Sequence, residues 1–238
     1  ISEVYVETFF PEVILKLKGK KRKDFFHYDY ISCPIIFSGQ KVKVEIKNTS
    51  PHEVAIVLFS NYWADDDKLK KITSNSFELN RNETKEISWE IPNTDSNPIG
   101  QIGIDIISNK KQSGEVMVNY VTFDGQPKQV FKRPDHIQSY KRGIEKKEGY
   151  YGQIWRNAWV QTLDKWEERG KNFRICQNIG REILFTGTDL WKDYSVSANI
   201  LLQSCNSGGL VSRVQGVKKY YTLEICRENK LRIGKMNN

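Results

Sequence analysis

Apolar and polar residues alternate along most of the chain after residue 30. In QKVKVEIKNTS (40–50), Val42, Val44 and Ile46 fall on one face of an extended strand, with the charged residues on the other. Similar runs follow as EVAIVLFSNYW, SFELN, KEISWEIP, IGQIGIDIIS and GEVMVNYVTF. Asn, Pro, Gly and Asp residues separate these runs at the spacing of an all-β sandwich, and the closing Gly-led hairpin is typical of a jelly roll.

The alternation stops between about residues 127 and 151. This stretch is charged and contains two prolines, which indicates a connector. Strand-like runs then resume as FRICQN, EILFTGT, YSVSANILLQS, GGLVSRVQ, YYTLEICR and KLRIGK. The pattern therefore predicts an all-β chain with two β-sandwich domains of jelly-roll type. The expected divisions are an N-terminal connector with a short helix at PEVILKLKG (1–29), a first sandwich (30–130), a linker (131–150) and a second sandwich (151–238).

The second predicted domain is short for a sandwich. Two packed sheets need more strands than residues 151–238 provide, so this domain is expected to be incomplete. The chain also begins ISEVYVETFF, without Met and without the pattern of a secretion signal. These two features predict that the sequence is a fragment of a longer protein.

The stretch GGLVSRVQGVKKYYTLEI (208–225) predicts a β-hairpin with its turn at residues 216–219. The expected cross-strand pairs are Val214 with Tyr221, Ser212 with Leu223, and Leu210 with Ile225, and they would form the core side. The opposite face would carry Val211, Arg213, Gln215, Tyr220, Thr222 and Glu224. That polar face is either a ligand-binding surface or a solvated face with cross-strand pairs such as Arg213 with Glu224.

Composition and charge narrow the class of protein. Hydrophobic residues make up 38% of the chain and aromatic residues 12%, which excludes a disordered polymer. No apolar stretch approaches the roughly 18 residues that span a membrane. The net charge is +8, and the densest basic run lies at residues 16–23. Without a nucleic-acid-binding motif we interpret that run as a solvated connector, so a nucleic-acid partner is not predicted.

Four cysteines stand at positions 33, 176, 205 and 226, without the spacing of a zinc or redox site. We expect free thiols, although a Cys205–Cys226 disulfide would form if their strands were neighbours. Free thiols favour a reducing compartment, and the predicted location is the cytoplasm.

Sequence motifs of catalysis are absent: there is no GxSxG, HExxH, Walker or GxGxxG pattern, and the three histidines have no nucleophile nearby. The best candidate for chemistry is WADDDKL, where Asp65, Asp66 and Asp67 follow Tyr62 and Trp63. A solvated loop is one interpretation. The alternatives are a sugar-binding edge, a carboxylate pair for glycoside hydrolysis, or ligands for a structural calcium ion. No other cofactor or metal is predicted.

A second aromatic group lies in IWRNAWVQTLDKWEER, where Trp155, Trp159 and Trp166 alternate with polar residues such as Arg156. These tryptophans either pack a sandwich edge or the seam between domains, or present a stacking platform for a sugar or a base.

Several stretches resemble a known family. WRNAWV, FRICQNIGREILFTGTDLWKDYSVSANI and GGLVSRVQGVKKYYTLEI, with ETFFPEVI and NPIGQIGIDI upstream, are similar to the C-terminal accessory region of bacterial ADP-ribosylglycohydrolase-family proteins. The first domain resembles a galactose-binding-type jelly roll and the second a concanavalin A/laminin-G-like sandwich. The resemblance implies that a helical, magnesium-dependent catalytic domain lies upstream, covalently linked, and that no catalytic residue lies in this chain.

These observations predict a non-catalytic accessory region that binds carbohydrate or a glycosylated ligand. The candidate ligand-binding residues are Tyr62, Trp63, Asp65, Asp66, Trp155, Arg156, Trp159, Arg213, Gln215 and Tyr220. One alternative is a structural or oligomerisation scaffold without a ligand, which predicts buried tryptophans and an apolar surface patch. Another is a glycoside hydrolase fragment acting through Asp65–Asp67.

Overall fold

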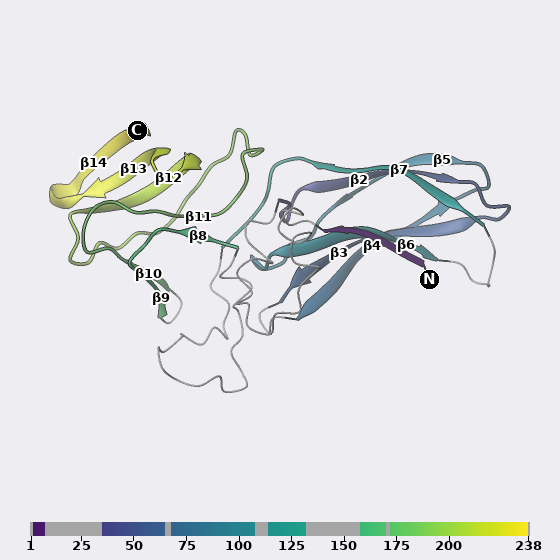
Figure 1. Ribbon diagram of the computed structural model, residues 1–238, viewed down its shortest axis with the longest axis horizontal. Coiled ribbons are helices and arrows are strands. Elements are labelled where there is room, and N and C mark those ends of the chain that lie inside the picture. The colour runs from purple at the N-terminus through teal and green to yellow at the C-terminus, as the bar shows by residue number, and fades with distance from the viewer. Residues whose placement is uncertain are drawn as a thin grey trace, which may run out of the picture.

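The computed structural model describes residues 2–7, 35–64, 68–107, 114–131, 158–169 and 172–237, with backbone alone for 2–7, 165–169 and residue 172. These residues form antiparallel strands and no α-helix, which confirms the predicted all-β class. Figure 1 shows two groups of strands, β1–β7 and β8–β14.

The first group consists of two antiparallel sheets that pack as a sandwich. The four-stranded sheet has the order β1 (Ser2–Glu7), β6 (Ile99–Ile107), β3 (Val54–Trp63) and β4 (Leu69–Leu79). The three-stranded sheet has the order β5 (Thr84–Glu90), β2 (Lys41–Asn48) and β7 (Val116–Asp124).

Alternation in β2 places the core where the sequence predicts it. Val42, Val44 and Ile46 are at most 1% exposed, and they belong to one buried cluster with Ile56 and Leu58 of β3. The intervening lysines and glutamate of β2 point away from this core. One face of each sheet is therefore apolar and the two faces meet, as in a sandwich.

One strand lies where the sequence predicted a connector. Residues 2–7 form β1, which pairs antiparallel with β6 from Ser2 opposite Ile106 to Glu7 opposite Gln101. The predicted helix PEVILKLKG (11–19) lies outside the described residues. The alternation in SEVYVE indicates a strand at β1. The segment was assigned to a connector because a basic run follows it.

A buried asparagine joins three segments at one end of the sandwich. Asn48, the last residue of β2, is fully buried, and its Nδ2 donates to the carbonyl oxygens of His52 (2.7 Å), Leu79 (3.0 Å) and Asn80 (3.1 Å). Its Oδ1 accepts from the backbone N of Ser50 at 2.9 Å. One side chain thus links the end of β2 to the turn after it and to the end of β4.

The second group consists of small sheets. β9 (Lys165–Arg169) pairs with β10 (Asn172–Cys176), and β8 (Val160–Gln161) pairs with β11 (Leu184–Phe185). A three-stranded sheet has the order β12 (Ser207–Gly216), β13 (Lys219–Cys226) and β14 (Lys230–Asn237), and a short 3₁₀ helix at Arg227–Asn229 joins the last two strands.

The β12–β13 hairpin has the predicted turn but a different register. Gly216 pairs with Lys219 as expected, whereas Ser212 pairs with Tyr221 and Leu210 with Leu223. The predicted pairs of Val214 with Tyr221, Ser212 with Leu223 and Leu210 with Ile225 are therefore wrong. An irregularity between Ser212 and Gly216, with Arg213 at φ +50°, shifts the register by two residues.

The buried face of this sheet is also the opposite of the predicted one. Tyr220, Thr222 and Glu224 are at most 6% exposed, whereas Tyr221 and Leu223 are each 45% exposed. Alternation correctly identified which residues of β13 share a face. It could not determine which face the rest of the chain covers, because both faces contain residues that can be buried.

Two further predictions concern cysteines and membranes. Cys176, Cys205 and Cys226 are free thiols, as predicted, and Cys33 lies outside the described residues. Within the described ranges, no helix has the length and apolar character needed to cross a bilayer.

Candidate functional site

The described residues among those predicted to bind a ligand lie on three segments: β3, the residues before β8, and the β12–β13 hairpin. Tyr62 packs against the sandwich core, and Trp63, its neighbour at the end of β3, is half-buried. Asp65, Asp66, Trp155 and Arg156 lie outside the described residues, so the acidic loop and its suggested calcium ion stay predictions.

The described tryptophans of the second group are in aromatic contacts. Trp159 is one of the partly buried residues of a hydrophobic cluster, together with Leu163, Phe173 and Leu184. Its ring centroid lies 4.8 Å from that of Phe131 in an edge-to-face arrangement. These contacts match the interpretation in which the tryptophans pack an edge or seam.

Trp191 makes the corresponding contact between the two groups of strands. Its ring lies 4.8 Å from that of Phe37, which is 5% exposed and precedes β2, and 5.9 Å from that of Tyr194. Tyr194 in turn accepts a hydrogen bond from the backbone N of Arg213. Trp191 thus connects the loop before β2 to the β12 strand.

The polar face of the β12–β13 hairpin is divided. Arg213 and Gln215 are exposed, whereas Tyr220 is 2% exposed and its ring is covered. The predicted row of Arg213, Gln215, Tyr220 and Glu224 is therefore not a continuous ligand surface.

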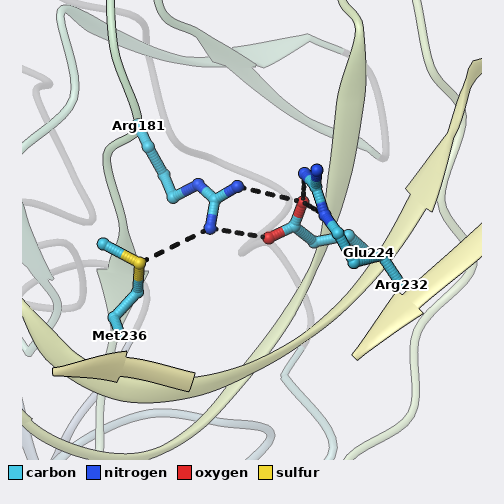
Figure 2. Close-up of polar contacts among 4 residues, drawn as sticks. All are labelled: Arg181, Glu224, Arg232 and Met236. Atoms are coloured by element: carbon cyan, nitrogen blue, oxygen red, sulfur yellow. Dashed lines mark hydrogen bonds and ion pairs between the residues drawn. The ribbon is translucent and has the colours of Figure 1, made fainter. Parts of the chain in front are cut away.

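A buried carboxylate between two arginines forms the most strongly connected polar cluster of the second group (Figure 2). Arg181 Nη1 and Nη2 lie 3.0 and 3.3 Å from the two carboxylate oxygens of Glu224. Arg232 donates to the same carboxylate from Nε at 3.2 Å and also from Nη2. Arg181 Nη1 also donates to Met236 Sδ at 3.6 Å. We call these residues the Glu224 cluster.

The electrostatics of the Glu224 cluster exclude general-acid chemistry at neutral pH. Burial raises the pKa of Glu224, but the hydrogen bond from Arg232 and the charge of Arg181 outweigh it and hold the pKa below its ordinary value. A general acid needs the opposite shift. The cluster instead ties the segment that carries Arg181 to β13 and β14. The sequence predicted Glu224 on an exposed face with Arg213 as its possible partner, and both predictions are wrong. Arg181, 43 residues away, shares no sequence pattern with Glu224.

A second polar arrangement lies on the outer face of the β5–β2–β7 sheet, and sequence reasoning missed it. Glu45 of β2 pairs with both Glu86 of β5 and Tyr120 of β7, so the three residues form one row. Tyr120 Oη donates to Glu86 Oε2 at 2.5 Å. Because β2 lies between β5 and β7, the phenol must extend over β2 to reach Glu86. We call this row, with Asn119, the Tyr120 platform.

A β-bulge turns two consecutive residues of β7 to the outer face. Glu45 pairs with Tyr120 but the next residue, Ile46, pairs with Val118, which leaves Asn119 as the extra residue. Asn119 and Tyr120 are both exposed, and Asn119 Nδ2 donates to Glu45 Oε1 at 2.7 Å. The signal was in the sequence: the alternation of VMVNYVTF changes phase between Val118 and Val121.

The bond to Glu86 predicts an unusual titration of Tyr120. The hydrogen bond to Glu86, partial burial, and the charges of Glu86 and Glu45 raise the pKa of Tyr120 to about 12 from an ordinary 10.0. A raised pKa stabilises the folded state below pH 10.0, and this stabilisation is lost as the pH rises towards about 12. We expect the variant Glu86→Gln to bring this ionisation back towards 10.0, measured by phenolate absorbance.

A matched control is Glu228→Gln, since Glu228 is exposed on the 3₁₀ helix of the second group and bonds to Lys230. That variant should leave the alkaline titration unchanged. A wild-type titration without any ionisation near pH 12 would contradict the bond between Tyr120 and Glu86.

Among the residues that the structure describes, no three metal-ligating side chains converge on one point. The fold and these clusters define an all-β protein of sandwich-like antiparallel sheets. No family model, curated protein or solved structure matches the chain. The relationship to ADP-ribosylglycohydrolase accessory regions therefore stays a prediction.

Proposed function

We propose that the chain is a non-catalytic carbohydrate-binding protein whose stacking platform is Tyr120. The observation that carries the proposal is the bond from Tyr120 across β2 to Glu86. It holds the ring over the sheet while the residue remains 38% exposed. An aromatic ring fixed in this way offers contact area at little further cost in side-chain entropy.

Polar side chains that can bond to sugar hydroxyls lie in the same row as Tyr120 and in the next row. Glu45 and Glu86 each accept one bond within the platform, from Asn119 and Tyr120. An ionised carboxylate has about four acceptor sites, so both retain capacity for hydroxyl donors. The next row along the sheet adds the side chains of Ser88, Lys43 and Thr122 on the same face.

The charge of the platform indicates a class of saccharide. Two carboxylates lie side by side in its central row, and the nearby Lys43 is already paired with Asp124. Uronic or sialic acids would be repelled there, whereas neutral sugars would not. The open sheet face also suits several consecutive sugars of an extended chain. We therefore propose neutral polysaccharides as the ligands.

Replacing Tyr120 by Ala should abolish most of the binding. We take the roughly 1–3 kcal/mol of base–aromatic stacking as the scale for a pyranose ring on Tyr120, which corresponds to a loss of about 5- to 150-fold in affinity. The measurement is affinity electrophoresis of the full chain through gels that contain neutral glucans, with polygalacturonate as the acidic comparison.

The matched control is Tyr221→Ala, because Tyr221 is a similarly exposed tyrosine, at 45%, on a different sheet. Tyr120→Phe is a further variant, which keeps the ring and removes only the bond to Glu86. We expect Tyr221→Ala to migrate as wild type does, and Tyr120→Phe to bind with intermediate strength. If Tyr120→Ala were retarded as strongly as wild type, the proposal would be wrong.

A further inference from the structure

The three-stranded β12–β13–β14 sheet has one face that the described chain covers only towards β12. Leu210, Leu223 and Ile233 form one row across the three strands, and Leu231 lies in the next. Exposure rises towards the edge strand, from 45% at Leu223 to 72% at Leu231 and 82% at Ile233. We call this surface the β12–β14 apolar face. Contiguous exposed apolar rows of this kind mark interaction surfaces.

The charge around this face identifies the kind of occupant. Residues 207–237 carry seven Lys and Arg side chains against two Glu, a net charge of +5 within a chain of +8. One of the two acids, Glu224, is buried on the opposite side and bonded to Arg232, and the other, Glu228, is bonded to Lys230. Lys235 lies in the row of Tyr221 on the apolar face itself.

A second copy of the chain fits this face poorly. Two copies would bring together two segments that each carry a net charge of +5. Strand spacing and rise give the face an area of about 400 Å², so docking on it buries about 800 Å² in total with any partner, which is the size of a transient contact. The charge therefore favours a different partner, and the area indicates that the contact is transient.

We infer that the β12–β14 apolar face docks a protein whose matching surface is flat and apolar, with carboxylates beside Lys235. Rows of branched side chains on a pleated sheet interdigitate with another rigid surface, as facing sheets do in a sandwich. Carboxylates on the partner would complement the basic edge and add to the association rate. This surface belongs to a different sheet from the Tyr120 platform, so it stands independently of saccharide binding.

Photo-crosslinking in the full chain tests the inference. A benzophenone amino acid is placed at position 233, and at position 117 in a control chain, because Met117 is also apolar and 54% exposed but lies on β7. Both chains are irradiated in extracts of cells that produce the protein. We expect a crosslinked protein from position 233 only, with Asp or Glu beside apolar residues in the crosslinked peptide and a lower yield at high salt.

Competition distinguishes specific docking from non-specific crosslinking. Excess wild-type chain should remove the crosslink, whereas excess Leu231→Glu chain should not. Leu231 is 72% exposed, so this variant should fold as wild type does. The inference would be overturned by equal yields at positions 233 and 117, by crosslinking of the chain to itself, or by sedimentation with phosphatidylcholine–phosphatidylserine vesicles that Leu231→Glu abolishes.

Discussion

Replacing Asn48 by Asp is expected to lower the free energy of unfolding by about 3–5 kcal/mol, although the two side chains have nearly the same shape. The fully buried Asn48 side chain donates to three carbonyl oxygens, at His52, Leu79 and Asn80. Aspartate has no N–H donors and would place a buried negative charge against those oxygens. The carbonyls of His52 and Asn80 have further donors in Ser50 Oγ and Glu83 N, so the cost comes mainly from this unpaired charge.

Urea unfolding followed by tryptophan fluorescence measures this loss, with the free energy obtained by linear extrapolation. The control is Asn75→Asp on β4, since Asn75 is exposed and the same substitution there should change stability by less than about 0.5 kcal/mol. If Asn48→Asp were as mild as its control, Asn48 would not join the three segments as described.

The second large effect concerns the Glu224 cluster. Replacing both Arg181 and Arg232 by Met leaves a carboxylate that is 8% exposed without a cationic partner. Breaking a buried pair in this way costs roughly 3–5 kcal/mol, because an uncompensated charge stays buried. Glu224→Gln should cost less, roughly 1–2 kcal/mol, because the guanidinium groups it releases are 40% and 52% exposed and can be hydrated.

Hydrogen exchange of the β13 amides measures the loss of local stability in the double arginine variant and in Glu224→Gln. The decisive result is the order: the double variant should lose more protection than Glu224→Gln. The cluster also predicts a pH dependence. Since the pKa of Glu224 lies below its ordinary 4.5, its contribution is complete above that pH and is lost as the pH falls through the lower folded value. Equal protection of β13 in wild type and in Glu224→Gln would show that the cluster does not hold this sheet.

The sequence predicted the strands more successfully than the surfaces. Alternation identified β2 and its buried face, because only one face of this strand is apolar, the face of Val42, Val44 and Ile46. On β13 either face can be buried. The face of Glu224 can be buried because Arg181 and Arg232 neutralise the carboxylate, and the face of Leu223 can be buried because it is apolar. Periodicity cannot decide such a case, because the outcome depends on which distant segment covers the strand.

In the candidate site too, a local pattern indicates one residue, whereas its partner depends on the sheet order. The change of phase around Asn119 is a local signal, and it would have identified Tyr120 as an outward-facing aromatic residue. The partner of Tyr120 lies on β5, two strands away in the sheet, and only the sheet order brings Glu86 within reach. Pairings of this kind follow from topology, which a single sequence does not contain.

The most direct test of the proposed function is a nuclear magnetic resonance titration of the full chain with a neutral β-glucan oligosaccharide. The account predicts saturable shifts at the backbone amides of adjacent rows on one sheet face, at Lys43, Glu45, Glu86, Tyr120 and Thr122, and their loss in Tyr120→Ala. Shifts that cluster around Trp159 or Arg213 instead, or no shifts at any concentration, would contradict a saccharide platform at Tyr120.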